Sequence, residues 1–193
     1  MTINFKRALW VAIVLPIVPA VSYPVLFASN SKPTKIAQPA AANSSAPPPC
    51  NTCLRLVKSS NSNSLDNPLY TLEAYSEGKL MHSFNAVTGR AYTQTRNRDQ
   101  SGTEAPLPDG NYSVSSTTIP GASAEVGEIF LPVYPQFQTG RSALGIHYDP
   151  SFNKSNGEDG TAGCIALTNK KNRDAINQFV ASHKPQLLIV NIQ

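Results

Sequence analysis

Two residues of this chain could act together in nucleophilic catalysis, His147 and Cys164. The first ends the apolar run A-L-G-I-H, and the second follows a polar, glycine-containing loop in G-T-A-G-C-I-A-L-T. A thiol is a poor nucleophile until it is deprotonated, and a nearby imidazole can take that proton and return it later. Gly163 lets backbone approach a substrate closely. The pair is therefore a candidate catalytic couple; the alternative is a small buried cysteine and an ordinary strand histidine.

The residues around the cysteine resemble the catalytic signature of the L,D-transpeptidase family, also called the YkuD-like domain. The run T-A-G-C-I-A-L at 161–167 is similar to the family's S/T-H-G-C-I/V-R-L/M, and the upstream G-I-H supplies its other histidine. Ala162 and Ala166 stand where the family usually has a second His and an Arg. A variant branch that includes secreted antibacterial effectors has a similar reduced pattern, and its G-R-x-x-x-x-I-H-x-D run resembles residues 140–149.

The resemblance covers roughly residues 66–193, a length ordinary for one domain. P-L-P-D-G-N-Y at 106–112 is similar to the family's P-x-P-x-G-x-Y/F step, and residues 169–192 are similar to its closing helix and strand. It implies a mainly β (α+β) fold, a β-sandwich or barrel with one C-terminal helix packed near the Cys turn.

Local patterns in the sequence also favour strands over helices. Residues 69–88 read as a hairpin with its turn at 77–79. A helix is expected between an N-cap at Thr168 or Asn169 and Pro185. Alternation and apolar runs predict the remaining strands at 54–59, 112–119, 126–133, 143–147 and 186–192.

The family resemblance implies acyl transfer on peptidoglycan stem peptides, with Cys164 as the nucleophile and His147 as the base. Backbone N–H groups around Gly163 and Cys164, in the turn that also contains Ala162, are expected to stabilise the oxyanion. Capture of the thioester by an amine would form a cross-link, whereas capture by water would make the same site an L,D-carboxypeptidase or endopeptidase. The family needs no metal or organic cofactor.

Other residues are expected to support this couple. By the same resemblance, Thr161 and Arg141 are expected to contact the substrate. The second imidazole nitrogen needs an acceptor to fix its tautomer. The carbonyl of Tyr148 is preferred by analogy with the family, and the alternatives are the carboxylates of Asp149, Glu158 and Asp159.

The N-terminal part of the chain resembles an export signal or an anchor. Lys6 and Arg7 precede an apolar run at 8–27, which is close to the ~20 residues that span a bilayer. Residues 1–28 are expected to be a signal sequence or, slightly favoured, a single-pass anchor that contacts the membrane and holds the rest in the periplasm or envelope of a bacterium. Residues 29–49 read as a Pro/Ser/Ala-rich linker.

Cys50 and Cys53 have a C-x-x-C spacing and begin a segment, 50–65, that leads into the domain. The spacing is compatible with a redox dithiol, half of a zinc site or a small disulfide loop. A disulfide, or two idle thiols, is favoured because the chain is expected to be exported and further paired zinc ligands are lacking. Cys164 is then the unpaired cysteine. Two rival functions remain, a cell-wall binding module without catalysis and a thiol-disulfide protein.

The net charge of +4 does not indicate a nucleic-acid partner. The 16 basic residues less four N-terminal ones leave 12, which equals the 12 acidic residues; those four are Lys6, Arg7, Lys32 and Lys35. No Lys/Arg cluster interleaved with aromatic residues is present. Residues 89–105 read as a long polar loop whose arginines could replace the missing motif Arg, unless the loop is simply solvated.

Overall fold

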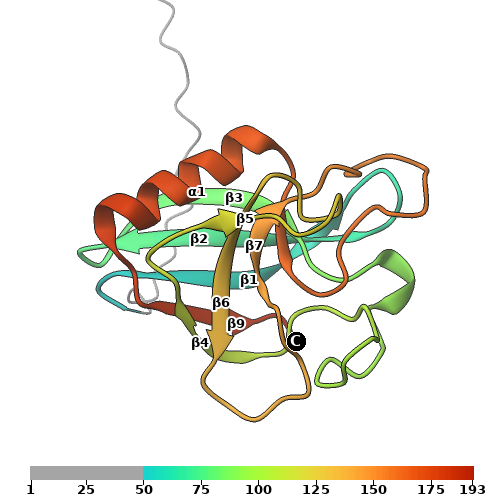
Figure 1. Cartoon of the computed structure of the whole chain (residues 1–193), viewed down its shortest axis with the longest axis horizontal. Helices are drawn as coiled ribbons and strands as arrows, with labels where there is room; N and C mark the ends of the chain where they lie inside the picture. Colours follow the sequence, from blue (N-terminus) through green and yellow to red (C-terminus); the bar gives the residue numbers. More distant parts are fainter. Residues whose placement is uncertain (1–49) are drawn as a thin grey trace, which may run out of the picture. The chain divides into compact units, whose positions relative to one another are not determined.

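The computed structural model describes residues 50–193 (Figure 1). The expected signal or anchor at 1–28 and the linker at 29–49 lie outside the described residues. Within 50–193, no helix has both the length and the apolar character needed to cross a membrane.

The described residues form one sheet and one α-helix. The sheet order is β4-β9-β1-β2-β3-β8-β7-β6-β5, and an additional β4–β6 pairing closes it on itself. In Figure 1, β6 and β7 cross over β1 and β2 in this view. The elements are β1 (Cys53–Ser62), β2 (Pro68–Ser76), β3 (Lys79–Val87), the 3-10 turn η1 (Ala91–Thr93), β4 (Gly110–Val114), β5 (Ile119–Pro120), β6 (Ile129–Pro135), β7 (Gly145–Tyr148), β8 (Ile165–Leu167), α1 (Lys170–His183) and β9 (Leu187–Asn191). The predicted mainly β fold with one C-terminal helix is confirmed.

The core is built from the inward faces of these strands and of α1. In the β1–β2 pair, Leu56 lies opposite Leu72, and both are fully buried. Asn169 is the N-cap of the helix, and its side chain accepts a hydrogen bond from the backbone of Asn172 at 2.9 Å. It packs against β7, β8 and β2 through an apolar face. The buried apolar residues on that face are Ile176, Phe179 and Val180.

Two predicted strands differ from the observed ones. The strand expected at 112–119 ends at Val114, because the Ser115 hydroxyl accepts from the backbone of Thr117 and donates to its carbonyl, which replaces ladder pairing with a turn. The strand expected at 126–133 begins only at Ile129, because Gly127 has a φ of +67°. Residues 121–128 therefore form a loop between β5 and β6.

The C-x-x-C segment is part of the sheet. β1 pairs antiparallel with β2 and parallel with β9, so it is an inner strand. Cys50 and Cys53 form a disulfide at its start. The Gly78 N–H donates to the Asn51 carbonyl at 2.8 Å, which joins this loop to the β2–β3 turn.

Candidate active site

Parallel pairing of β7 and β8 brings the two candidate catalytic residues together. His147 lies within β7 opposite Ala166 of β8, and Cys164 directly precedes β8. Both side chains line one pocket of about 260 Å³. The polar loop between them makes this short parallel pairing possible, since parallel strands need a crossover connection.

His147 is held as a neutral imidazole. It is 1% exposed, and its Nδ1 lies 2.8 Å from the Tyr148 carbonyl oxygen. A carbonyl can only accept, so Nδ1 carries the proton and Nε2 has a free lone pair. Within the described residues Nε2 makes no hydrogen bond. Burial, with the Phe130 ring stacked at 6.2 Å, lowers the pKa of His147 to about 4.

The Asp149 carboxylate does not hold the imidazole. Its two oxygens accept from the backbone N–H groups of Ser151, at 2.7 Å, and Gly160, at 2.8 Å. These bonds close the loop that leads back toward the cysteine. Burial raises the pKa of Asp149 to about 6, against the opposing effect of the two N–H donors.

Cys164 is a thiol at neutral pH. The residue is partly exposed, and burial raises the pKa of its thiol to about 11. Hydrogen bonding from the Gly145 backbone and the charge of Arg141 oppose this shift. The sulfur lies 3.7 Å from the Ala143 carbonyl oxygen. Burial therefore disfavours the charged forms of both side chains, the Cys164 thiolate and the His147 imidazolium.

Thr161 holds the Cys turn in place. It is fully buried, and its hydroxyl accepts from Gly89 N–H at 3.2 Å and Gly163 N–H at 3.0 Å. The same hydroxyl donates to the Cys164 carbonyl at 2.8 Å. Its hydrogen-bonding capacity is thus used within the chain, so its observed role is structural and its contact with a substrate stays a prediction. The Gly163 N–H is likewise engaged, and is not free for an oxyanion.

Arg141 places a positive charge beside the turn. Its guanidinium is 8% exposed and donates from Nη2 to the Ala162 carbonyl at 2.7 Å. Nη1 donates to the carbonyls of Arg98 and Ala105, at 3.1 and 3.4 Å. Arg141 also lines the pocket. The motif position Ala166 is fully buried in an apolar cluster, so the charge near the cysteine comes from residue 141 instead.

Sequence reasoning missed a second polar contact of the turn. The Ala162 N–H donates to Glu125 Oε1 at 2.6 Å, and Arg90 Nη2 lies 3.5 Å from the same oxygen. Glu125 belongs to the 121–128 loop, and no local pattern marked it. Arg90 lies in the loop predicted to supply a positive charge, but nothing distinguished it there from Arg96 and Arg98.

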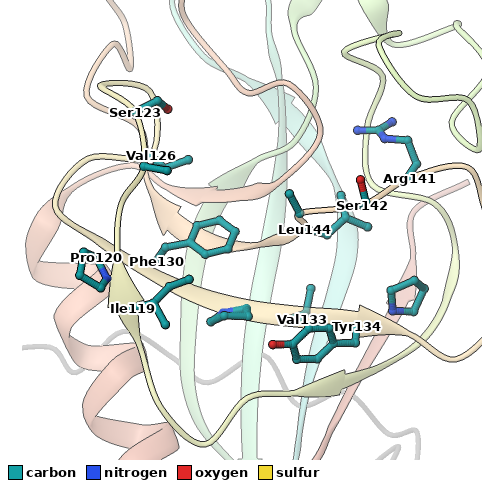
Figure 2. Close-up of a pocket in the computed structure, with 14 residues that line it drawn as sticks. Ile119, Pro120, Ser123, Val126, Phe130, Val133, Tyr134, Arg141, Ser142 and Leu144 are labelled. Atoms are coloured by element: carbon teal, nitrogen blue, oxygen red, sulfur yellow. The ribbon is translucent and has the colours of Figure 1, made fainter.

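A larger apolar pocket of about 690 Å³ adjoins the catalytic pocket. Figure 2 shows Ile119, Phe130 and Val133 around it, with Arg141 and Leu144 at the other side. The stretch 141–144 lines both pockets, so the apolar cavity continues from the cysteine. In the described part of the chain, no three His, Cys, Asp or Glu side chains are grouped as metal ligands.

Comparison with known proteins identifies the family. Residues 64–182, more than half of the chain, match the family model of the L,D-transpeptidase catalytic domain. The chain belongs to this family. L,D-transpeptidase domains are cell-wall peptidoglycan enzymes, which suggests that the protein is exported. A search of curated proteins gives no match.

Solved structures show the same fold. Pgp2, a helical cell shape determining protein from Campylobacter jejuni, is 18% identical with a TM-score of 0.50, over 74% of this chain and 49% of that one. The structure of its K307A mutant is 22% identical with a TM-score of 0.49, over 74% of this chain and 48% of that one. An L,D-transpeptidase from Xylanimonas cellulosilytica is 14% identical with a TM-score of 0.41, over 75% of this chain and 63% of that one. The chain spans about half the length of the Pgp2 chains, and the likeness to Pgp2 with a TM-score of 0.50 shows the fold alone.

The two buried titratable groups predict opposite effects on stability. His147 has a native pKa of about 4, below its ordinary 6.5, so its contribution is lost as pH falls through this window, by about 3 kcal/mol at most. Asp149 has a native pKa of about 6, above its ordinary 3.8, so its contribution is present at low pH and lost as pH rises through 6. Between pH 4 and 6 the two should offset each other.

We therefore expect His147→Gln to gain stability relative to the wild type as pH falls from 6.5 to 4, and Asp149→Asn to lose it. Urea unfolding at pH 4, 5 and 6.5 measures the three free energies of unfolding. Variants whose stability runs parallel to the wild type at all three pH values would contradict these shifts.

Proposed function

We propose that this L,D-transpeptidase domain is a cysteine-dependent acyl-transfer enzyme acting on peptidoglycan stem peptides. The observation that supports it most is the state of His147. Its Nδ1 is held by the Tyr148 carbonyl, its Nε2 makes no hydrogen bond within the described residues, and His147 and Cys164 line the same pocket. A base with a fixed tautomer beside a thiol is the arrangement that acyl transfer requires.

The proposed reaction has two halves. In the first, Cys164 Sγ attacks the peptide carbonyl carbon, His147 Nε2 takes the thiol proton, and the carbon–nitrogen bond breaks as that proton passes to the leaving amine. The peptide is then held as a thioester. In the second, a water or an amine attacks the thioester carbon and gives a proton to His147 Nε2, the carbon–sulfur bond breaks, and the departing sulfur takes that proton from the imidazole. The backbone N–H of Cys164 would stabilise the oxyanion in both halves.

The acceptor decides the outcome of the reaction. An amine of another stem would give a cross-link, and water would give a shortened stem, an L,D-carboxypeptidase or endopeptidase product. We further propose that residues 1–28 direct export or anchor the chain, that 29–49 are a spacer, and that the catalytic domain at 66–193 acts outside the cytoplasmic membrane.

Product analysis tests the proposal. The purified protein is incubated with tetrapeptide and pentapeptide muropeptides, and products are followed by mass spectrometry. We expect cross-linked dimers or shortened stems, lost in Cys164→Ala and retained in the Cys50→Ser/Cys53→Ser control. A carbapenem should add its mass to Cys164. Unchanged muropeptides together with an unmodified thiol would favour the binding module, and activity lost only in the control would favour the thiol-disulfide protein.

A further inference from the structure

Arg90 is a buried guanidinium with unused donors beside the Cys turn. It is 7% exposed, and its Nε and Nη1 atoms make no hydrogen bond within the described residues. Two carboxylates approach it, Glu125 at 3.5 Å from Nη2 and Glu104 at 3.8 Å from Nε. A guanidinium always carries its charge, so its burial is favourable only where an anion is held nearby.

A single carboxylate oxygen contacts both the Ala162 N–H and the Arg90 guanidinium. Glu125 Oε1 accepts from this N–H at 2.6 Å and is the oxygen that faces Arg90 Nη2. Backbone N–H and guanidinium donors to one carboxylate are the charge-assisted set that recognises a carboxylate ligand. Glu125, Glu104 and Ala162 line the pocket that contains Cys164. Arg90 does not itself line this pocket, so the anion site lies behind its wall, with Glu125 between the buried guanidinium and the pocket.

The present occupant of this site belongs to a loop at the surface. Glu125 is 33% exposed in its side chain. The loop that carries it is closed at its base by Gly121 N–H donating to the Glu128 carbonyl at 3.1 Å. The Glu125 side chain can thus turn toward solvent by rotation about its own bonds, with the loop closed. If the carboxylate of a ligand replaces that of Glu125, Arg90 still has an anionic partner.

We propose that Arg90 and the Ala162 N–H form the subsite for the free C-terminal carboxylate of the stem peptide, and that Glu125 fills it when substrate is absent. This inference rests on the function proposed above and names the part of the substrate that is recognised. Ala162 is two residues from the nucleophile, and in a tetrapeptide stem cut at its last peptide bond the free carboxylate lies on the residue that departs after attack. The site thereby favours stems with a free terminus, the substrates of a carboxypeptidase or an exchange reaction.

An oxyanion hole is the competing interpretation of the Ala162 N–H. A tetrahedral oxyanion forms on every substrate, whatever its terminus, so loss of its donors slows all substrates alike. A carboxylate subsite distinguishes a free acid from its amide. The two roles therefore predict different results for the same pair of peptides.

Binding to an inactive protein tests the subsite without requiring turnover. The full chain carrying Cys164→Ala is titrated calorimetrically with a tetrapeptide stem as its free acid and as its C-terminal amide. We expect the acid to bind about tenfold more tightly. Adding Arg90→Gln should remove that preference, and adding Glu125→Gln should tighten binding of the acid because the internal competitor is weakened. Arg96→Gln, which removes the same charge from an exposed site in the same loop, should change neither affinity.

Equal binding of acid and amide would overturn the subsite, as would an Arg90→Gln protein that weakens both peptides equally. If Arg90→Gln does not fold, the Glu125→Gln protein still tests the subsite, because it should bind the acid more tightly and the amide no more tightly than the parent protein does. Turnover of muropeptides without any preference for the acid would reject this inference alone. A preference for the acid in binding, with no turnover by the wild type, would reject the proposed function alone.

Discussion

His147→Gln should lower the turnover of muropeptides at pH 7 by about 10²- to 10⁴-fold. The reason lies in the two protonation states. With the pKa of Cys164 at about 11, almost no thiolate forms at neutral pH unless a base takes the proton. His147, with a pKa of about 4, is neutral and able to do so across the whole range above that value. Gln has no basic nitrogen to replace it.

The pH profiles of the two proteins should therefore differ in shape. The wild-type rate should be nearly flat from pH 6 to 9, because the imidazole stays neutral and the thiol stays protonated. The rate of His147→Gln should rise about tenfold per pH unit, since its thiolate fraction grows in that proportion below pH 11. Initial rates with one tetrapeptide measure both profiles, with Cys164→Ala as the inactive control. A flat profile for His147→Gln would show that the imidazole is not the base.

The parts of the fold that were predictable are those set by local patterns. Alternation and the Glu77-Gly78 turn gave the β2–β3 hairpin, and Asn169 and Pro185 bounded α1. Where a side chain forms a turn with its own backbone, as Ser115 does after β4, apolar alternation misses the break. The sequence analysis did not predict β8 as a strand of its own, because three residues are too few to show an alternation of apolar and polar side chains.

The candidate site divides in the same way. His147 and Cys164 lie in a run of characteristic residues, so the sequence marked them. The Glu125–Ala162 contact joins segments 37 residues apart and arises only when β6, β7 and β8 pair side by side. Arg141 was expected at the substrate, and the structure shows what local sequence cannot encode, its bonds to three backbone carbonyls from distant segments.

Gly163→Ala should reduce stability by about 2–4 kcal/mol and turnover by at least about 100-fold. Gly163 has a φ of +114°, which a residue with a Cβ rarely adopts. A Cβ at this position would overlap Arg141 Nη2 and lie 2.8 Å from the Ala105 carbonyl oxygen. The guanidinium would have to move, which would leave the carbonyls that it now binds without a partner. Because Ala162 and Cys164 flank Gly163, the nucleophile would move with the turn.

Gly157→Ala separates backbone strain from this clash. Gly157 also has a positive φ, +82°, but a Cβ there would have no atom within 4 Å. We expect it to cost only about 1 kcal/mol and to leave turnover unchanged, as measured by urea unfolding and initial rates. Adding Arg141→Ala to Gly163→Ala should cost less than the sum of the single changes, because the clash disappears with the guanidinium. If Gly163→Ala were no more harmful than Gly157→Ala, Arg141 would not be the support that holds the Cys turn.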